Sequence, residues 1–183
     1  MTERHLIVVD TETTGLDVDR AVVVELAAVN VTTGEEFYLV PFIDREDLAK
    51  LDPVAMTVNR YFERRLYAQM SDWDATAKAM WGFADFVSDH TFAGSNPRFD
   101  AVLIEKLLDR HDAEPSWHHR LADISPFAAG ALGLSPTDLP GLERVCELLE
   151  VVNKDPHTAL GDARATAECF RRVAAMRKNG GPA

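Results

Sequence analysis

Two acidic residues near the N-terminus, Asp10 and Glu12, follow an apolar run at residues 6–9 that is rich in β-branched side chains. This run predicts a buried strand that ends at Asp10. Side chains alternate along a strand, so positions 10 and 12 project to the same side. Two neighbouring carboxylates repel each other unless a positive charge lies between them, and Mg²⁺ prefers oxygen ligands. The pair indicates a divalent-metal site, with a strand end whose acids only cap the following turn as the structural alternative.

Two further acids lie on the apolar faces of predicted helices. Asp100 is in the first turn of one helix and shares a face with Ile104 and Leu107. Asp162 begins the apolar face of the last helix, a face that continues to Met176. The helix dipole favours acids in a first turn by about 0.3–1 kcal/mol. Each position therefore fits a structural role as well as a metal ligand.

A histidine precedes the last of these acids by five residues. His157 follows Pro156, which places it in a loop rather than on the same helix face as Asp162. A loop histidine beside metal-bound acids could take a proton from water, because its ordinary pKa lies near neutrality. The alternative is an ordinary surface histidine.

The elements that must position these residues follow from hydrophobic periodicity. Three predicted strands come first, with the second and third joined as a hairpin, and strands then alternate with helices. Pro41 makes the third strand an edge strand, and Trp81 is expected on the buried side of its helix. The strands are predicted at 6–9, 20–31, 36–43, 91–94 and 119–124, and the helices at 73–90, 99–111, 125–134, 141–150 and 161–176. This order predicts an α/β fold, with a hairpin on one side of the sheet and βα units on the other.

Composition limits the classes of protein. The 183 residues predict one domain over 1–178 and a short disordered tail over 179–183. The sequence has no apolar run long enough to span a bilayer and no ordinary secretory signal, so we expect a cytoplasmic protein without membrane contact. Cys146 and Cys169 are expected to be buried thiols rather than a disulfide. The net charge of −11 argues against a broad duplex-binding surface, but an enzyme can also meet phosphate through metal ions.

Taken together, three segments form a recognisable set. The segments Asp10-Thr11-Glu12-Thr13-Thr14-Gly15-Leu16, Asn96-x-x-Phe99-Asp100 and His157-x-x-x-x-Asp162-Ala163 resemble the three motifs of the DEDDh 3′–5′ exonucleases. This superfamily includes the proofreading epsilon subunit of bacterial DNA polymerase III, ribonuclease T and oligoribonuclease. The resemblance extends from residue 6 to about 175. It implies a ribonuclease H-like fold, with a mixed five-stranded sheet flanked by helices.

The resemblance also implies roles for individual residues. Asp10, Glu12, Asp100 and Asp162 would coordinate two Mg²⁺ ions, for which Mn²⁺ could substitute, and His157 would be the general base.

Weaker features of the resemblance concern the substrate. Leu16 would wedge against the terminal base, and the segment Thr13, Thr14 and Gly15 would receive the 3′ end. Met56, Val58 and Asn59 would line the nucleotide pocket, and Asn96 would hold either its loop or the substrate.

Four charged residues are not assigned by the motifs. Arg60, Arg64 and Arg65 could guide a nucleic-acid backbone or form a solvated helix face. Glu25, in an otherwise apolar strand, is expected to pair with a nearby cation or hydroxyl.

The expected activity is metal-dependent release of mononucleotides from the 3′ end of single-stranded nucleic acid. The first motif favours DNA, because it resembles the epsilon branch more than oligoribonuclease; RNA trimming is the nearest alternative. A second alternative is an inactive module that binds nucleic-acid ends or a polymerase, although all five catalytic positions are filled. A DNA polymerase is a candidate partner, and the sequence does not determine the oligomeric state.

Overall fold

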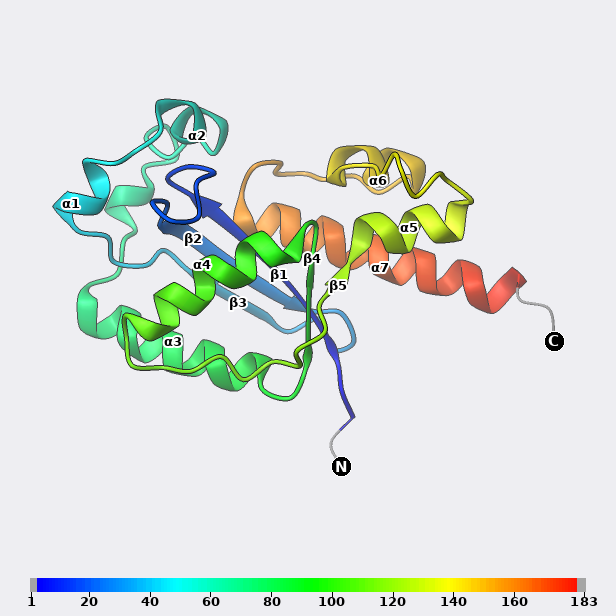
Figure 1. The fold of residues 1–183 in the computed structure, drawn as a ribbon, viewed down its shortest axis with the longest axis horizontal. Coiled ribbons are helices and arrows are strands. Elements are labelled where there is room, and N and C mark those ends of the chain that lie inside the picture. Colours follow the sequence, from blue (N-terminus) through cyan, green and yellow to red (C-terminus); the bar gives the residue numbers. More distant parts are fainter. Residues whose placement is uncertain (1–2, 181–183) are drawn as a thin grey trace.

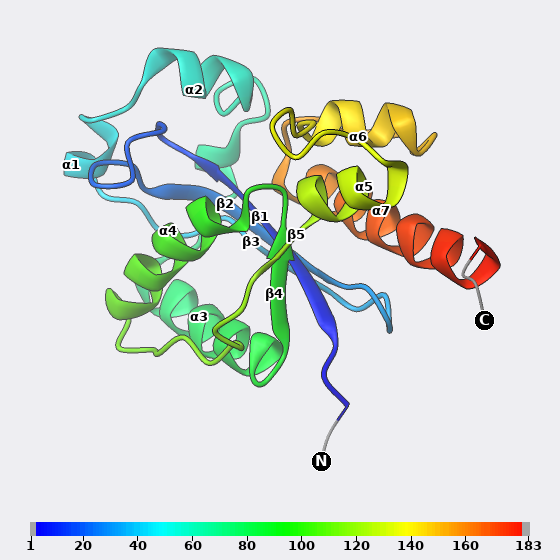
Figure 2. The same ribbon diagram turned by 45° about the vertical axis from the view of Figure 1, so that its right-hand side comes forward.

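The computed structural model describes residues 3–180, with side chains described through Met176. A five-stranded sheet lies between two groups of helices (Figures 1 and 2). The strands are β1 (Leu6–Thr13), β2 (Val23–Asn30), β3 (Glu36–Leu39), β4 (Thr91–Gly94) and β5 (Ala122–Asp123). Their order is β3-β2-β1-β4-β5, and β1 pairs antiparallel with β2 and parallel with β4. The mixed five-stranded α/β sheet predicted above is confirmed.

Helices cover both faces of the sheet, and short helices lie at one end of it. They are α1 (Arg45–Leu48), α2 (Pro53–Val58), α3 (Trp73–Val87), α4 (Pro97–Asp109), α5 (Ile124–Leu132), α6 (Leu142–Leu148) and α7 (Ala159–Gly180), with a 3-10 turn at Leu66–Ala68. One apolar cluster joins the sheet to α3 and α4, and a second joins the opposite face to α5, α6 and α7. A third, smaller cluster lies beneath α2 and includes Val24, Met56 and Leu66.

Strand β1 is central, and its alternation decides which side each acid faces. Ile7 and Val9 pack into the α3–α4 cluster, whereas Val8 packs into the α7 cluster. Asp10 and Glu12 continue the series of Val8 and therefore face α7.

The strand boundaries differ from prediction where pairing overrides local pattern. β1 does not end at Asp10 but continues to Thr13, because β2 pairs with it as far as Thr13–Val23 after a register shift at Glu12. β3 ends at Leu39, before Pro41, since proline has no N–H to donate to a neighbouring strand. β3 is an edge strand, as predicted.

Two predicted helix faces need correction. Trp81 is 55% exposed, because the buried face of α3 is centred on Met80, Phe83 and Val87, about a quarter-turn away. Met176 is 45% exposed, since α7 runs beyond the edge of the sheet (Figure 1). α7 also continues through Gly180, and the rest of the predicted tail, 181–183, lies outside the described residues.

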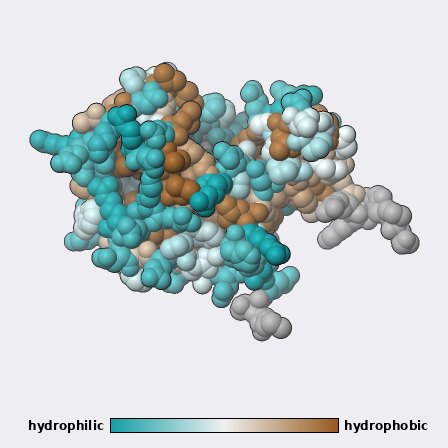
Figure 3. Space-filling view, viewed as in Figure 1, coloured by the Kyte–Doolittle hydropathy of each residue, from teal (hydrophilic) through white to brown (hydrophobic). Residues whose placement is uncertain are grey.

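The surface is mostly hydrophilic on one face (Figure 3). Hydrophilic residues predominate on the face in Figure 3, and an apolar strip runs from beside α2 down between α4 and α5. Cys146 and Cys169 are buried free thiols, as predicted, with their Sγ atoms 3.7 Å apart. Among the described residues, no helix combines the length and apolar character needed to cross a bilayer.

Candidate active site: an acidic cluster between β1 and α7

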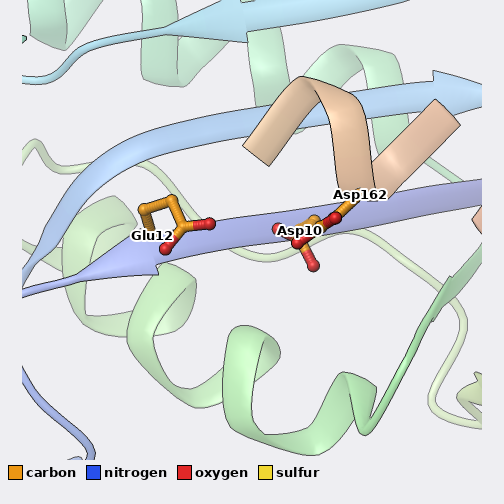
Figure 4. A group of neighbouring side chains, drawn as sticks. All are labelled: Asp10, Glu12 and Asp162. Atoms are coloured by element: carbon orange, nitrogen blue, oxygen red, sulfur yellow. The ribbon is translucent and has the colours of Figure 1, made fainter. Parts of the chain in front are cut away.

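Three carboxylates meet where the first turn of α7 approaches β1. One oxygen each from Asp10, Glu12 and Asp162 lies within 4.8 Å of the other two. Figure 4 shows Asp10 and Asp162 close together and Glu12 further along the strand. All three side chains are partly buried. The structure therefore brings together residues more than 150 positions apart in sequence, as the metal-site prediction requires.

The loop before α7 holds Asp162 in place. The Asn153 side chain donates a 2.5 Å hydrogen bond to Asp162 Oδ1, and the backbone N–H of His157 donates to Oδ2 at 3.3 Å. Both carboxylate oxygens thus have a donor within the protein. The orientation of this carboxylate depends on the loop from 153 to 157.

Asp100 joins the site from the opposite side of β1. It is 5% exposed, in the first turn of α4, and its Oδ1 accepts hydrogen bonds from the backbone N–H of Thr11 at 3.0 Å and the Thr11 hydroxyl at 2.7 Å. It is not within the group of three clustered carboxylates. Its charge nevertheless raises the pKa of Asp10, so the four acids share one electrostatic environment.

Burial disfavours ionisation of all four acids, and repulsion between carboxylates adds to this effect at Asp10 and Glu12. Burial, then the charges of Asp100 and Asp162, raise the pKa of the Asp10 carboxyl well above its usual range. Burial, then Asp162, raise the pKa of Glu12 to about 8. Burial raises the pKa of Asp100 to about 6 against the opposing hydrogen bonds from Thr11. Burial also raises the pKa of Asp162.

A divalent cation fits this arrangement. The clustered ligands are hard carboxylate oxygens, the donors that Mg²⁺ and Mn²⁺ prefer. A bound cation would also offset the repulsion between carboxylates that contributes to the raised pKa values of Asp10 and Glu12.

His157 lies beside Asp162 at the surface. It is exposed and adopts a left-handed backbone conformation with φ of 57°, which is uncommon for a residue with a side chain. With Asp162, Asn153 and Cys146, it lines a cavity of about 400 Å³. The loop position predicted for His157 is therefore correct.

The residues predicted to receive the 3′ end are mostly engaged within the protein. Thr13 and Thr14 are buried, and the Thr14 N–H and C=O bond to Val22 and Asp52 at 2.9 and 2.8 Å. Gly15, which follows Thr14 in the chain, is also buried. Leu16 is 83% exposed, which leaves its side chain free to contact a ligand.

Of the other predicted substrate residues, Met56 and Asn59 are less accessible than expected, whereas Asn96 is exposed. Met56 is 3% exposed and packs in the apolar cluster beneath α2. Asn59 is 1% exposed; its amide donates to Thr13 O at 3.1 Å and accepts from the N–H of Tyr61. Asn96 is exposed and precedes α4 in a left-handed conformation that asparagine tolerates, without a side-chain capping bond.

The arginines after α2 do not form a helix face, and Arg64 is held in an ion pair while Arg60 and Arg65 are exposed. Arg60 and Arg65 have positive φ values, so the segment is a series of turns. Arg64 pairs with Glu25, which also accepts a hydrogen bond from the Tyr38 hydroxyl. The prediction that Glu25 pairs with a cation or hydroxyl is confirmed.

Sequence reasoning missed Thr11 and Asn153, the side chains that hold Asp100 and Asp162. Thr11 could have been found, since strand alternation places it on the face opposite Asp10, toward the helix that carries Asp100. Asn153 lies in a loop without periodicity and gives no comparable signal.

Comparisons with known proteins agree with this geometry. The sequence matches the exonuclease (RNase_T) family over residues 7–170. A search of curated proteins found no match. Among solved structures, a product-bound exonuclease I has a TM-score of 0.74 and 18% identity, covering 97% of this chain and 45% of that one. Exonuclease I from E. coli with a dT13 oligonucleotide has a TM-score of 0.72 and 18% identity, covering 97% and 42%.

A third similar structure is the exonuclease I of Methylocaldum szegediense, with a TM-score of 0.73 and 22% identity over 97% of this chain and 41% of that one. The chain spans less than half the length of these exonuclease I chains. The fold they share is ribonuclease H-like. The family match over 7–170 shows that the chain belongs to the exonuclease family, which confirms the predicted DEDDh 3′–5′ exonuclease assignment.

The raised pKa values predict how stability changes with pH. An acid whose pKa is raised by folding holds a proton that the unfolded chain releases, so stability falls as pH rises between the two pKa values. For Glu12 this window runs from 4.5 to about 8. In a chelator, the melting temperature should fall by several degrees between pH 5.5 and pH 8, and Mg²⁺ should restore it most at pH 8. Asp10→Asn should weaken both effects, and a chelated protein that gains stability up to pH 8 would contradict this account.

Gly161 predicts a second test, because its neighbours leave no room for a side chain. A Cβ at this position would lie 2.0 Å from the Asp155 carbonyl oxygen, in the loop that carries His157. Gly161→Ala should displace this loop and lower turnover by about 10–100-fold, the cost of misplacing a reacting group by about 1 Å. Gly82→Ala is the matched control, because nothing lies within 4 Å of its Cβ, and it should leave activity unchanged. Equal activity of the two variants would show that the loop geometry does not matter.

Proposed function

We propose that this protein is a divalent-metal-dependent exonuclease that removes mononucleotides from the 3′ end of single-stranded nucleic acid, with DNA favoured. The observation that carries the proposal is the convergence of Asp10, Glu12 and Asp162 oxygens within 4.8 Å of one another. Burial, and then the charges of neighbouring acids, raise the pKa values of Asp10 and Glu12 and so oppose their ionisation, which makes a merely structural role a poor explanation.

Asp10, Glu12 and Asp162 would hold two Mg²⁺ ions, with Asp100 contributing the carboxylate oxygen that Thr11 does not bind. When bound, such ions supply an activated water and stabilise the charge on the leaving oxygen. Mn²⁺ would substitute because it accepts the same oxygen ligands.

His157 would act as the general base. His157 is exposed and lines the same cavity as Asp162, so its imidazole would be accessible to water beside the proposed metal site. In this role, the imidazole accepts the proton of the attacking water while the phosphodiester bond breaks. The left-handed backbone at His157 is the kind of strained geometry that active sites often retain.

The surface around the site fits an unpaired strand better than a duplex. Apolar side chains are exposed on the β1–β2 loop and near α2, namely Leu16, Val54, Val58 and Phe62. Such side chains can pack against unstacked bases. The net charge of −11 does not favour a broad phosphate-binding surface. The dT13 oligonucleotide bound to the similar exonuclease I supports DNA as the strand.

Purified protein should release mononucleotides from 5′-labelled single strands with a free 3′-hydroxyl, in Mg²⁺ or Mn²⁺, and faster from DNA than from RNA of the same sequence. Blocking the 3′ end should slow the reaction, whereas blocking the 5′ end should not. Faster cleavage of RNA would favour the trimming alternative. No cleavage of either strand with either metal would favour a module that only binds ends.

Asp10→Asn should abolish measurable activity. It should also raise the melting temperature of the metal-free protein, measured in a chelator. The substitution removes one of the mutually repelling charges, and functional acids are commonly held at a cost in stability. Steady-state assays and thermal unfolding in a chelator check the two parts. An active Asp10→Asn variant would place the metal site elsewhere.

His157→Ala should lower kcat by about 10²–10⁴-fold, the usual contribution of a general base. Because the backbone N–H that contacts Asp162 remains, metal affinity should stay close to that of the wild type. Mn²⁺ titration and single-turnover kinetics distinguish the two effects. Turnover equal to that of the wild type would remove His157 from the mechanism.

A further inference from the structure

Glu25 is a buried carboxylate that lies directly across from the metal-site acids. It is 1% exposed on β2, opposite Glu12 in the β1–β2 register, and it faces α7 as Glu12 does. Its charge is among those that raise the pKa values of Asp10 and Glu12. An acid at this position makes the cluster more repulsive, so its presence needs an explanation.

The hydrogen bonds of Glu25 show that it is not a metal ligand. Oε1 accepts from Arg64 and from the Tyr38 hydroxyl at 2.8 Å. Oε2 accepts from Arg64 at 2.8 Å and from the backbone N–H of Ala159 at 3.2 Å. Two donors fill each oxygen, so the carboxylate has no free position for a cation.

The guanidinium of Arg64 reaches three separate parts of the site. Besides Glu25, its Nη1 donates to the carbonyl oxygen of Asn59 at 3.2 Å and to that of His157 at 3.4 Å. Glu25 in turn holds Ala159, two residues beyond His157. Both partners of the ion pair thus contact the short segment that carries the imidazole.

We propose that Glu25 and Arg64 are positioning residues, whose paired side chains fix the backbone on either side of His157 and thereby set where its imidazole lies. This rests on the proposed role of His157 as general base. The pair neutralises its own buried charge and acts through the backbone, without touching the substrate. The planar fork of arginine suits this task, because it can meet both carboxylate oxygens and still donate to a carbonyl.

Arg64→Lys tests the proposal with little risk to folding. Lysine keeps a positive charge beside the buried Glu25 but cannot donate to two carboxylate oxygens and two carbonyls in the same geometry. We expect kcat to fall about 10–100-fold with KM and Mn²⁺ affinity near those of the wild type, because only the base is misplaced. Hydrogen exchange should become faster at the amides of residues 157–159.

The matched control is Arg164→Lys. Arg164 makes a comparable two-pronged pair with Glu36, with both contacts at 2.6 Å, but at the exposed surface. This control should change neither kcat nor the exchange of residues 157–159.

A double-mutant cycle separates this inference from the proposed function. In a His157→Ala background, Arg64→Lys should cost less than about twofold in kcat, because the group it positions has been removed. A full additional loss, or a change in KM alone, would overturn the inference and point to Asn59 as the relevant contact.

If His157→Ala itself retains full turnover, the proposed base fails, while hydrogen exchange still shows whether the pair fixes the loop. Unchanged exchange in Arg64→Lys would overturn the inference in either case.

Discussion

The structure depends on the repulsion among carboxylates gathered where β1 meets the start of α7. Asp10, Glu12 and Asp162 lie close enough to share one cation. Burial raises the pKa of each, and the charges of neighbouring carboxylates add to this effect at Asp10 and Glu12. Without a cation the cluster destabilises the fold, since each acid must stay protonated or be ionised beside like charges. A divalent ion turns the same geometry into a favourable site. Function and local instability therefore have one cause, as is common where a catalytic site is built into a rigid sheet.

The rest of the site consists of hydrogen bonds and an ion pair that hold the surrounding groups in place. Thr11 binds Asp100 from the far side of β1, and Asn153 binds Asp162 from the loop before α7. The Glu25–Arg64 pair joins β2 to the segment around His157. The first two contacts each hold one acid from a different element, and the ion pair contacts the segment around the proposed base, His157. Such supporting contacts decide whether a site is preorganised for its reaction.

Much of the fold and the site could be predicted from sequence, because the signals are local. Asp10 and Glu12 interrupt an apolar strand at a spacing of two, and the last motif places His157 five residues before Asp162. The supporting contacts could not be predicted in the same way. Thr11 and Asp100 are 89 residues apart, and Arg64 and Glu25 are 39 apart. Their pairing depends on how the helices pack on the sheet, which no short-range periodicity encodes.

The same distinction explains the errors at element boundaries. The sequence around Asp10 looks like a strand end, yet pairing with β2 extends β1 to Thr13. Met56 and Asn59 were expected to line a nucleotide pocket, but both side chains are buried: Met56 packs in the apolar cluster beneath α2, and Asn59 bonds to the backbone of Thr13 and Tyr61. In each case a tertiary contact overrides a local preference.

The most direct test of the account is to locate Mn²⁺ by anomalous scattering in crystals of the protein grown near neutral pH. The account predicts Mn²⁺ bound directly to oxygens of Asp10, Glu12 and Asp162, with Asp100 contacting the same site. Crystals that show Mn²⁺ only at surface carboxylates, with this cluster empty at saturating metal, would contradict it.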